Sequence, residues 1–402
     1  MRPFRSTVSL AEARRLLAEA MQPIARTERV ALANGAGRVA AADITSAIDV
    51  PPFARSAMDG YAVVSSDTQG ATDDAPRRLQ ILERLYTSQL PRLRVAPGAC
   101  AEIATGAPVP DGADAVVMAE ETRQVDSHRV DVLVPARAGQ NIGRRGADIT
   151  AGQVVVRCGE TLTPSRVGAV AAIGWAEVDV YLQPRVAVLS TGNEVVEPGA
   201  PLGDGQIYDV NRFTLASLIA DNGGIPDPRP PARDALDELI AALDACAGAD
   251  LIVFSGGSSV GERDLVVDLV AARGEMLFHG IAIKPGKPTA FARLGGTPFF
   301  GMPGNPTSCL SNAYVFLVPF LRATARLQVR EPRTVRVPLR QRIVSAPGRH
   351  QFYTVRVVDG AAFPAFKGSG EITSLSQADG YIEIPEEQSV VAEGTVVEVK
   401  LF

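Results

Sequence analysis

The feature that most constrains the fold is a regular alternation of apolar runs and helical segments between Arg185 and Leu327. Residues 186–189 and 251–254 are apolar at every position, which is typical of strands that are buried on both faces of a parallel sheet. This alternation predicts a mostly parallel, doubly wound α/β sheet. Helices are expected over 211–222 (with Asn211 as its cap), over 234–247, from about residue 264, and over 307–327.

The other parts of the chain have a different pattern, and 402 residues exceed what one ordinary core accommodates. Short strands separated by Gly, Pro and Asp turns indicate a β-rich module, and the tail alternates valine with arginine without a helical period. We therefore expect an α/β multidomain protein. Its domains are a discontinuous N-terminal domain (1–46 and 139–184), an inserted β-rich domain (47–138), a central α/β domain (185–328) and a small C-terminal β domain of barrel type (329–402).

Charge and composition exclude several classes of protein. The net charge of −5 argues against a general nucleic-acid surface, and no apolar run has the length of a membrane span. The N-terminus shows no apolar export segment, and four scattered cysteines fit buried thiols in a reducing compartment. We expect a cytoplasmic protein that binds neither nucleic acid nor membrane. The cysteines are Cys100, Cys158, Cys246 and Cys309.

Three glycine-rich turns, at 190–194, 255–261 and 301–305, follow expected strands of the parallel sheet. Ligands bind beyond the carboxyl ends of such strands, so the three turns are expected at one edge. Their backbone N–H groups and the following helix N-termini favour a phosphate or another oxyanion. The candidate binding residues in these turns are Thr191, Gly192, Ser255, Gly256, Gly257, Gly304 and Asn305.

Lysine is rare in this chain, with four lysines among 40 basic residues, yet Lys284 and Lys287 lie three positions apart. A compact ammonium group differs chemically from the planar guanidinium that the chain otherwise uses. The pair therefore predicts an anion site, and the alternative is a chance pair in a turn. The segment is not a P-loop, because five residues separate Gly280 from Gly286 and Pro288 follows the second lysine.

Acidic residues accompany the glycine-rich turns. Glu194 follows the first turn, Asp264 follows the second, and Asp234 begins an expected helix. Carboxylates beside a phosphate site suggest Mg²⁺, which takes oxygen ligands and shares them with substrate phosphates. For Asp234 and Asp264 the alternative is a helix N-cap. By its local pattern Asp59, which precedes Gly60, is an acid in a common turn pair.

Several long motifs, taken together and in order, resemble the molybdopterin molybdenumtransferase family, which includes the bacterial MoeA proteins and the gephyrin E domain. The resemblance covers nearly the whole chain. The segments that carry it are 51–63, 105–110, 112–117, 143–149, 190–194, 205–209, 255–257, 260–264, 284–288 and 301–306.

The resemblance implies an elongated homodimer of four-domain subunits that inserts molybdate into adenylylated molybdopterin and releases AMP. The parallel-sheet domain would hold the pterin, and Asp59 and Thr105 of the partner subunit would reach that site. Glu194, Asp234 and Asp264 would be the functional acids, with Glu194 and Asp264 as Mg²⁺ ligands.

By the same resemblance, Lys284 and Lys287 would bind the anion, and Pro303 and Ser369 would line the molybdate region. The chain departs from the family pattern at Asn193, Ala147, Ser258 and Arg55, and none of these departures removes a proposed acid or lysine.

Two alternatives belong to other functional classes. A molybdopterin adenylyltransferase would share the parallel-sheet domain but would not need the β-rich module that carries Asp59. A non-catalytic scaffold or carrier of the same fold would bind its ligand or a peptide without turnover. For the molybdenumtransferase, the upstream adenylyltransferase is a further expected partner.

Overall fold

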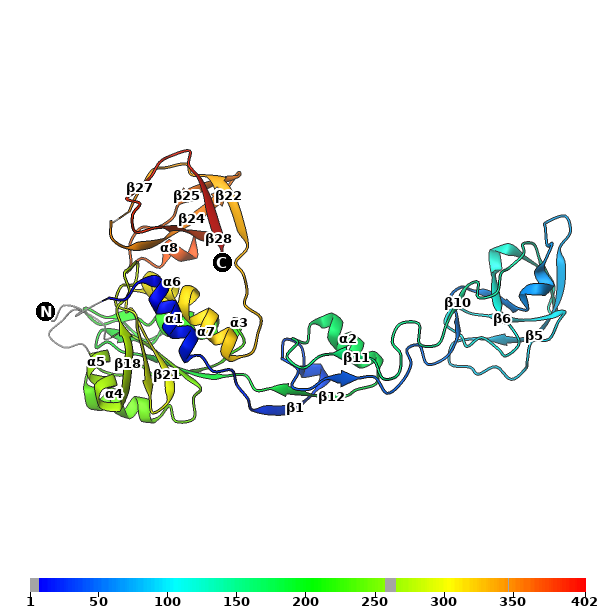
Figure 1. The fold of residues 1–402 in the computed structure, drawn as a ribbon, viewed down its shortest axis with the longest axis horizontal. Helices are drawn as coiled ribbons and strands as arrows, with labels where there is room; N and C mark the ends of the chain where they lie inside the picture. Colours follow the sequence, from blue (N-terminus) through cyan, green and yellow to red (C-terminus); the bar gives the residue numbers. More distant parts are fainter. Residues whose placement is uncertain (1–6, 257–264, 346) are drawn as a thin grey trace. The chain divides into compact units, whose positions relative to one another are not determined.

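The computed structural model describes residues 7–256, 265–345 and 347–402. The chain divides into two compact units (Figure 1). The first unit comprises Met1–Glu28, Gly37–Val39 and Val180–Phe402, and the second comprises Arg29–Ala36 and Ala40–Asp179.

The central sheet of the first unit has six strands, in the order β16-β13-β17-β21-β20-β18. The first four are parallel to one another, and the last two add an antiparallel edge. The prediction of a mostly parallel sheet is therefore confirmed. In this order the strands are Ile225–Pro228, Arg185–Ser190, Leu251–Ser255, Thr297–Met302, Ala290–Leu294 and Gly274–His279.

Helices cover both faces of this sheet, because alternate residues of each strand point to opposite sides. Val186 and Val188 pack into one core with α1, α3, α6 and α7, whereas Ala187 and Leu189 pack into the other with α4 and α5 (Figure 1). The sheet is thus doubly wound. The helices are α1 Leu10–Ala20, α3 Asn211–Asp221, α4 Leu236–Asp244, α5 Leu265–Arg273, α6 Pro306–Asn312 and α7 Val318–Thr324.

Two details of the expected helices are wrong. Asn211 does not cap α3 but is its first residue, and the carboxylate of Asp209 accepts the N–H of Arg212 instead. The helix expected over 307–327 is interrupted by the π-helical turn Ala313–Leu317 between α6 and α7. Pro319, near the start of α7, has no N–H and excludes the carbonyl four residues before it, so the regular ladder is lost there.

The C-terminal domain is built on a sheet of order β19-β24-β26-β28-β22, with β25 paired to β24, around an aliphatic core. Its strand β19 lies in the sequence of the central domain, so the two domains share this sheet. The expectation of no helix here is wrong for one short turn, α8 Thr373–Ser376. The strands are Ile283–Lys284, His350–Val358, Gly380–Ile384, Val396–Leu401, Thr334–Pro338 and, for β25, Ala361–Pro364.

The second unit contains the expected β-rich module. Its sheet runs β7-β4-β6-β5-β9-β8 and packs on two small, mostly aliphatic cores, and the same unit contains helix α2 Pro164–Ala172. From β4 to β9 the strands are Gly60–Val63, Arg77–Leu85, Ala99–Ile103, Ala115–Met118, Thr122–Asp126 and Arg129–Val132.

The remaining short strands are mostly two-residue pairs. In the second unit β2 pairs with β11, and β3 with β10; in the first unit β14 pairs with β15, and β23 with β27. They are β1 Thr27–Ala31, β2 Ile44–Thr45, β3 Arg55–Ser56, β10 Ile142–Gly143, β11 Val154–Val156, β12 Glu177–Tyr181, β14 Val195–Val196, β15 Ile207–Tyr208, β23 Ile343–Val344 and β27 Val390–Val391.

Two further expectations concern thiols and membranes. Cys100, Cys246 and Cys309 are buried as expected, but Cys158 is exposed, so the expectation is wrong for that residue. Within the described ranges, no helix combines the length and the apolar character that crossing a membrane requires.

Candidate functional site

The three glycine-rich turns begin at one edge of the central sheet. Ser190 at the end of β13 lies opposite Ser255 at the end of β17, and Ser255 lies opposite Met302 at the end of β21. Because these strands are parallel, their following turns leave the sheet on the same side. The expectation that the turns share an edge is confirmed for their described residues.

The turns approach one another closely, and at Gly256 this approach requires glycine. At Gly256 the backbone has a φ of +105°, and a Cβ atom there would lie 2.5 Å from the carbonyl oxygen of Thr191. At Gly304 a Cβ would lie 3.5 Å from the Cα of Gly256. The N–H of Thr191 also donates to the carbonyl of Ser255 at 3.0 Å. The turns therefore form one surface of closely spaced backbone, which suits an oxyanion or phosphate.

Two acids flank the first turn. The Oγ1 of Thr191 donates to Asp234 at 2.5 Å, and the N–H of Asp234 donates to the side-chain oxygen of Asn193 at 3.3 Å. The carboxylate of Glu194 folds back beside Gly192, where a Cβ would lie 2.9 Å from Oε2. Both carboxylates are exposed and can meet a ligand.

The N-cap alternative for Asp234 is wrong. Helix α4 begins at Leu236 with Ala235 in the cap position, and no side chain caps it. Asp234 precedes the cap, and its carboxylate accepts a hydrogen bond from Thr191 in the first turn instead.

A buried polar network, which the sequence analysis did not identify, supports this edge. The hydroxyl of Ser190 donates to Asp209 at 2.6 Å, and the Nε of Arg212 lies 3.3 Å from the same carboxylate. The guanidinium of Arg212 also pairs with Glu197, and its burial lowers its pKa. Ser190, Asp209 and Arg212 are 3%, 4% and 6% exposed. The network fixes the start of α3 against the end of β13, and the position of Asp209 just before a helix is the one sequence signal for it.

The third turn is held from two sides. The side-chain N–H of Asn211 donates to the carbonyl of Gly304 at 2.8 Å. At the start of α6, the N–H of Thr307 donates to the carbonyl of Ser369 at 3.1 Å, and its hydroxyl donates to the carbonyl of Glu371 at 2.7 Å. The structure thus brings Ser369 beside the turn that contains Gly304, Asn305 and the buried Pro303.

The two lysines lie at the other end of α6. Lys284 and Lys287 are half-buried, and between them Gly286 adopts a φ of +94°. The side chain of Asn312 donates to the carbonyl of Gly286 at 2.9 Å and to Thr289 at 2.5 Å, which fixes this turn. At 1.5 Å per residue, the seven residues of α6 separate the lysine turn from the third glycine-rich turn by about 10 Å.

In the second unit, Asp59 and Thr105 contact each other. The N–H of Thr105 donates to Asp59 at 2.6 Å. This contact and the Thr105 hydroxyl lower the pKa of the exposed Asp59 carboxyl. Asp59 lines a pocket of about 230 Å³ together with residues of β4, β5 and β6. The structure describes this pair within its own unit.

Two of the predicted site residues, Gly257 and Asp264, lie outside the described residues. Within the described ranges, no group of three or more histidine, cysteine, aspartate or glutamate side chains is placed to hold a metal ion. Glu194 and Asp234 nevertheless present carboxylate oxygens at this edge of the sheet, which is the donor chemistry that Mg²⁺ prefers.

Comparison with known proteins is consistent with this architecture along the whole chain. The profile of the MoeA N-terminal region (domain I and II) matches residues 8–174, that of a probable molybdopterin binding domain matches 187–323, and that of the MoeA C-terminal region (domain IV) matches 336–402. This chain belongs to the MoeA family.

Relatives of this MoeA chain align over almost their full length. Molybdopterin molybdenumtransferase 2 of Mycobacterium tuberculosis is 36% identical, with 97% of this chain and 98% of the relative covered. The molybdopterin molybdenumtransferase of Haemophilus influenzae is 34% identical, with 98% of each covered. The crystal structure of a molybdopterin biosynthesis MoeA protein from Pyrococcus horikoshii is 38% identical, with a TM-score of 0.85 over 98% of this chain and 99% of that one.

Proposed function

We propose that this chain is a molybdopterin molybdenumtransferase, which inserts molybdate into adenylylated molybdopterin and releases AMP. Membership of the MoeA family and the names of its relatives support this activity. The observation that carries it is that the glycine-rich turns lie together at one edge of the sheet. The first of these turns binds the carboxylate of Asp234, and the turn that contains the two lysines lies about 10 Å from the third.

In this proposal the chain acts by positioning its substrates and neutralising charge. The backbone N–H groups of the turns bind the phosphates, and Lys284 and Lys287 bind molybdate beside Pro303 and Ser369. Glu194 and Asp264 would hold Mg²⁺, which supplies charge neutralisation at the phosphoanhydride.

We further propose that the protein is a cytoplasmic homodimer in which Asp59 and Thr105 of the partner subunit complete the site. The lowered pKa of Asp59 keeps its carboxylate ionised, so it can orient a water or a molybdate oxygen toward the phosphoanhydride. Attack by that oxygen cleaves the phosphoanhydride and releases AMP, and the two dithiolene sulfurs, giving up their protons, replace one molybdate oxygen, which leaves as water. The adenylyltransferase that makes the substrate is the partner expected to deliver it.

The test is AMP release from adenylylated molybdopterin by the purified protein with Mg²⁺, with and without molybdate. We expect molybdate-dependent release that Asp59→Asn and Lys284→Ala each lower by about a hundredfold, since each removes a charge that acts on the reacting groups. Asp73→Asn is the matched control, because Asp73 is an aspartate of the same module whose side chain is 75% exposed and pairs with Arg123.

The outcomes separate the alternatives. Formation of adenylylated molybdopterin from ATP and molybdopterin would identify an adenylyltransferase. Tight substrate binding without AMP release would leave a carrier or scaffold and overturn the proposed reaction.

A further inference from the structure

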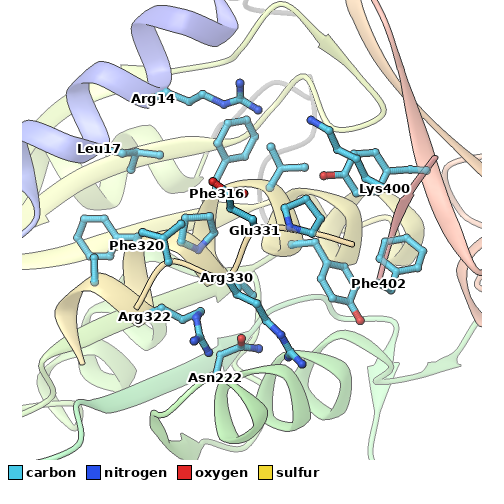
Figure 2. A pocket seen from close by; sticks show the side chains of 18 of the residues that line it. Arg14, Leu17, Asn222, Phe316, Phe320, Arg322, Arg330, Glu331, Lys400 and Phe402 are labelled. Carbon is cyan, nitrogen blue, oxygen red and sulfur yellow. The ribbon is translucent and has the colours of Figure 1, made fainter. Parts of the chain in front are cut away.

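A second pocket, of about 860 Å³, lies in the first unit and contains none of the residues proposed for the reaction. Its walls come from α1, the π-helical turn and α7, the segment 329–333 that leads into the C-terminal domain, and strands β26 and β28 (Figure 2). This volume lies within the range of small-molecule sites in proteins. The proposed reaction gives the pocket no role.

Aromatic rings form much of the pocket wall. Phe316 and Phe320 are buried at its base, and Tyr314, Tyr381 and the half-exposed Phe402 continue the surface. The ring of Phe402 lies 4.7 Å from that of Tyr314 and 5.8 Å from that of Tyr381, centroid to centroid. Such a wall offers a flat ligand ring the offset and edge contacts that aromatic groups favour.

Basic side chains surround these rings. The pocket is lined by five basic residues and only two acids, Glu331 and Glu383. Figure 2 shows Arg14 and Lys400 on one side of the aromatic group and Arg322 and Arg330 on the other. The basic residues are Arg14, Arg322, Arg330, Arg333 and Lys400.

The charges of this rim are only partly neutralised within the protein. Glu383 accepts its close contacts from His350 at 3.1 Å and Lys400 at 2.6 Å and interacts with Arg14 only through longer-range electrostatics. Arg322 donates to the carbonyl of Gln328 at 2.9 Å. In the part of the chain that the structure describes, Arg14 and Arg330 make neither an ion pair nor a side-chain hydrogen bond. Their guanidinium groups can therefore bind an external anion in a bidentate manner.

We propose that this pocket binds a small aromatic anion, a planar ring that carries one phosphate or carboxylate group. The rings of the wall receive the ligand ring, and Arg14 on one side of them or Arg330 on the other binds its anionic group. The volume of about 860 Å³ is that of a site for one small molecule, which favours such a ligand over an extended acidic peptide. Because the lining draws on α1, α7 and the C-terminal strands together, the bound ligand stabilises the contact between the central and C-terminal domains.

Phenyl phosphate is the probe, measured by calorimetry and by saturation-transfer NMR on the full-length protein. Benzyl alcohol supplies the ring without the charge, and inorganic phosphate supplies the charge without the ring. We expect phenyl phosphate to bind at least about tenfold more tightly than either, since each control lacks one of the two contacts.

Two variants test whether phenyl phosphate binds in this pocket. Arg14→Glu/Arg330→Glu reverses both unpaired charges and is expected to weaken binding by at least about tenfold. Ala18→Trp places a large ring in the pocket from the exposed side of α1 and blocks it without removing a charge. Arg336→Glu is the matched control, because it reverses an exposed arginine of β22 outside the lining.

Phenyl phosphate binding by Lys284→Ala distinguishes a failure of this proposal from a failure of the proposed reaction. Binding of phenyl phosphate that survives Lys284→Ala and Arg336→Glu but is lost in both pocket variants supports the assignment, whatever the outcome of the AMP assay. Binding that Lys284→Ala abolishes, equal binding of inorganic phosphate, or no binding at all would overturn it. A tighter response to an acidic phenylalanine-containing peptide would assign the pocket to a protein partner instead.

Discussion

At the residue scale, the chain shows how far single side chains can be interpreted from sequence. The scarcity of lysine singled out Lys284 and Lys287, and the structure places both in one turn fixed by Asn312. The partnership of Ser190, Asp209 and Arg212 was not predictable, because the hydrogen bond that joins Ser190 to Asp209, 19 positions away, depends on how β13 and α3 meet. The hydrogen bond between Asp59 and Thr105 was equally unpredictable, since the two residues lie 46 positions apart.

Glu383 offers a test of pH dependence at this scale. Its hydrogen bond to His350 and then its contacts with Lys400 lower its pKa from 4.5 to about 2. The unfolded state therefore takes up a proton at a higher pH than the folded state, and the stability that Glu383 contributes is present above pH 4.5 and lost as the pH falls to about 2.

We expect Glu383→Gln to lower the local stability of the C-terminal sheet by about 1–2 kcal/mol near neutral pH. The difference from wild type should shrink between pH 4.5 and about 2. Hydrogen exchange of β24 and β26, corrected for intrinsic rates, measures it, with the exposed Glu398→Gln on β28 as control. A difference that stays constant down to pH 2 would contradict the assigned ion pairs.

At the element scale, strands and helices with a clear period were predicted well, and their ends were not. The apolar runs of β13 and β17 and the amphipathic α1 follow from local sequence. The cap of α3 was misassigned because both Asp209 and Asn211 are residue types that favour caps. Only the tertiary contact of Asn211 with Gly304 decides between them. The sharing of β19 between two domains had no local signal, since a two-residue strand is defined by its partner.

The lysine turn provides the second prediction. A Cβ atom on Gly286 would lie 2.1 Å from the Nδ2 of Asn312, and the φ of +94° also disfavours any side chain. Gly286→Ala should therefore cost the left-handed strain of about 1–2 kcal/mol and, in addition, break the hydrogen bonds of Asn312. Molybdate-dependent turnover should fall with it.

Gly296→Ala is the matched control for this prediction. Its φ is +92°, but nothing lies within 4 Å of the added Cβ, so it carries the strain without the clash. Equal losses of stability and turnover in the two variants, measured by denaturant unfolding and AMP release, would show that Asn312 does not hold the turn.

The buried network gives the third prediction. Asp209→Ala removes the carboxylate that accepts the N–H of Arg212 at the start of α3. It also removes one of the negative charges that balance the buried Arg212 guanidinium. We expect α3 and β13 to lose about 3 kcal/mol of protection, measured by hydrogen exchange. Asp204→Ala, an exposed aspartate of the preceding turn, is the control and should change little. Unchanged exchange in Asp209→Ala would rule out a structural role for the network.

At the scale of the whole molecule, the sequence predicted the architecture through the order of its patterns rather than through any one of them. The parallel sheet, the β-rich module and the C-terminal β domain are all present. The proposed meeting of Asp59 with the central domain is not encoded in any local pattern, because these residues belong to separate compact units. The proposal that they meet across a dimer therefore needs a test that reports on subunit composition.

Mixing two inactive variants supplies that test. If each active site combines Asp59 of one subunit with Lys284 of the partner subunit, a mixed dimer of Asp59→Asn and Lys284→Ala contains one site with both residues intact. Random pairing makes half of the dimers mixed, so co-expression should restore about a quarter of wild-type AMP release. If each chain builds its site alone, no dimer contains an intact site and no activity returns. Co-expression of Asp59→Asn with Asp59→Ala is the control, because no pairing of those chains restores the carboxylate.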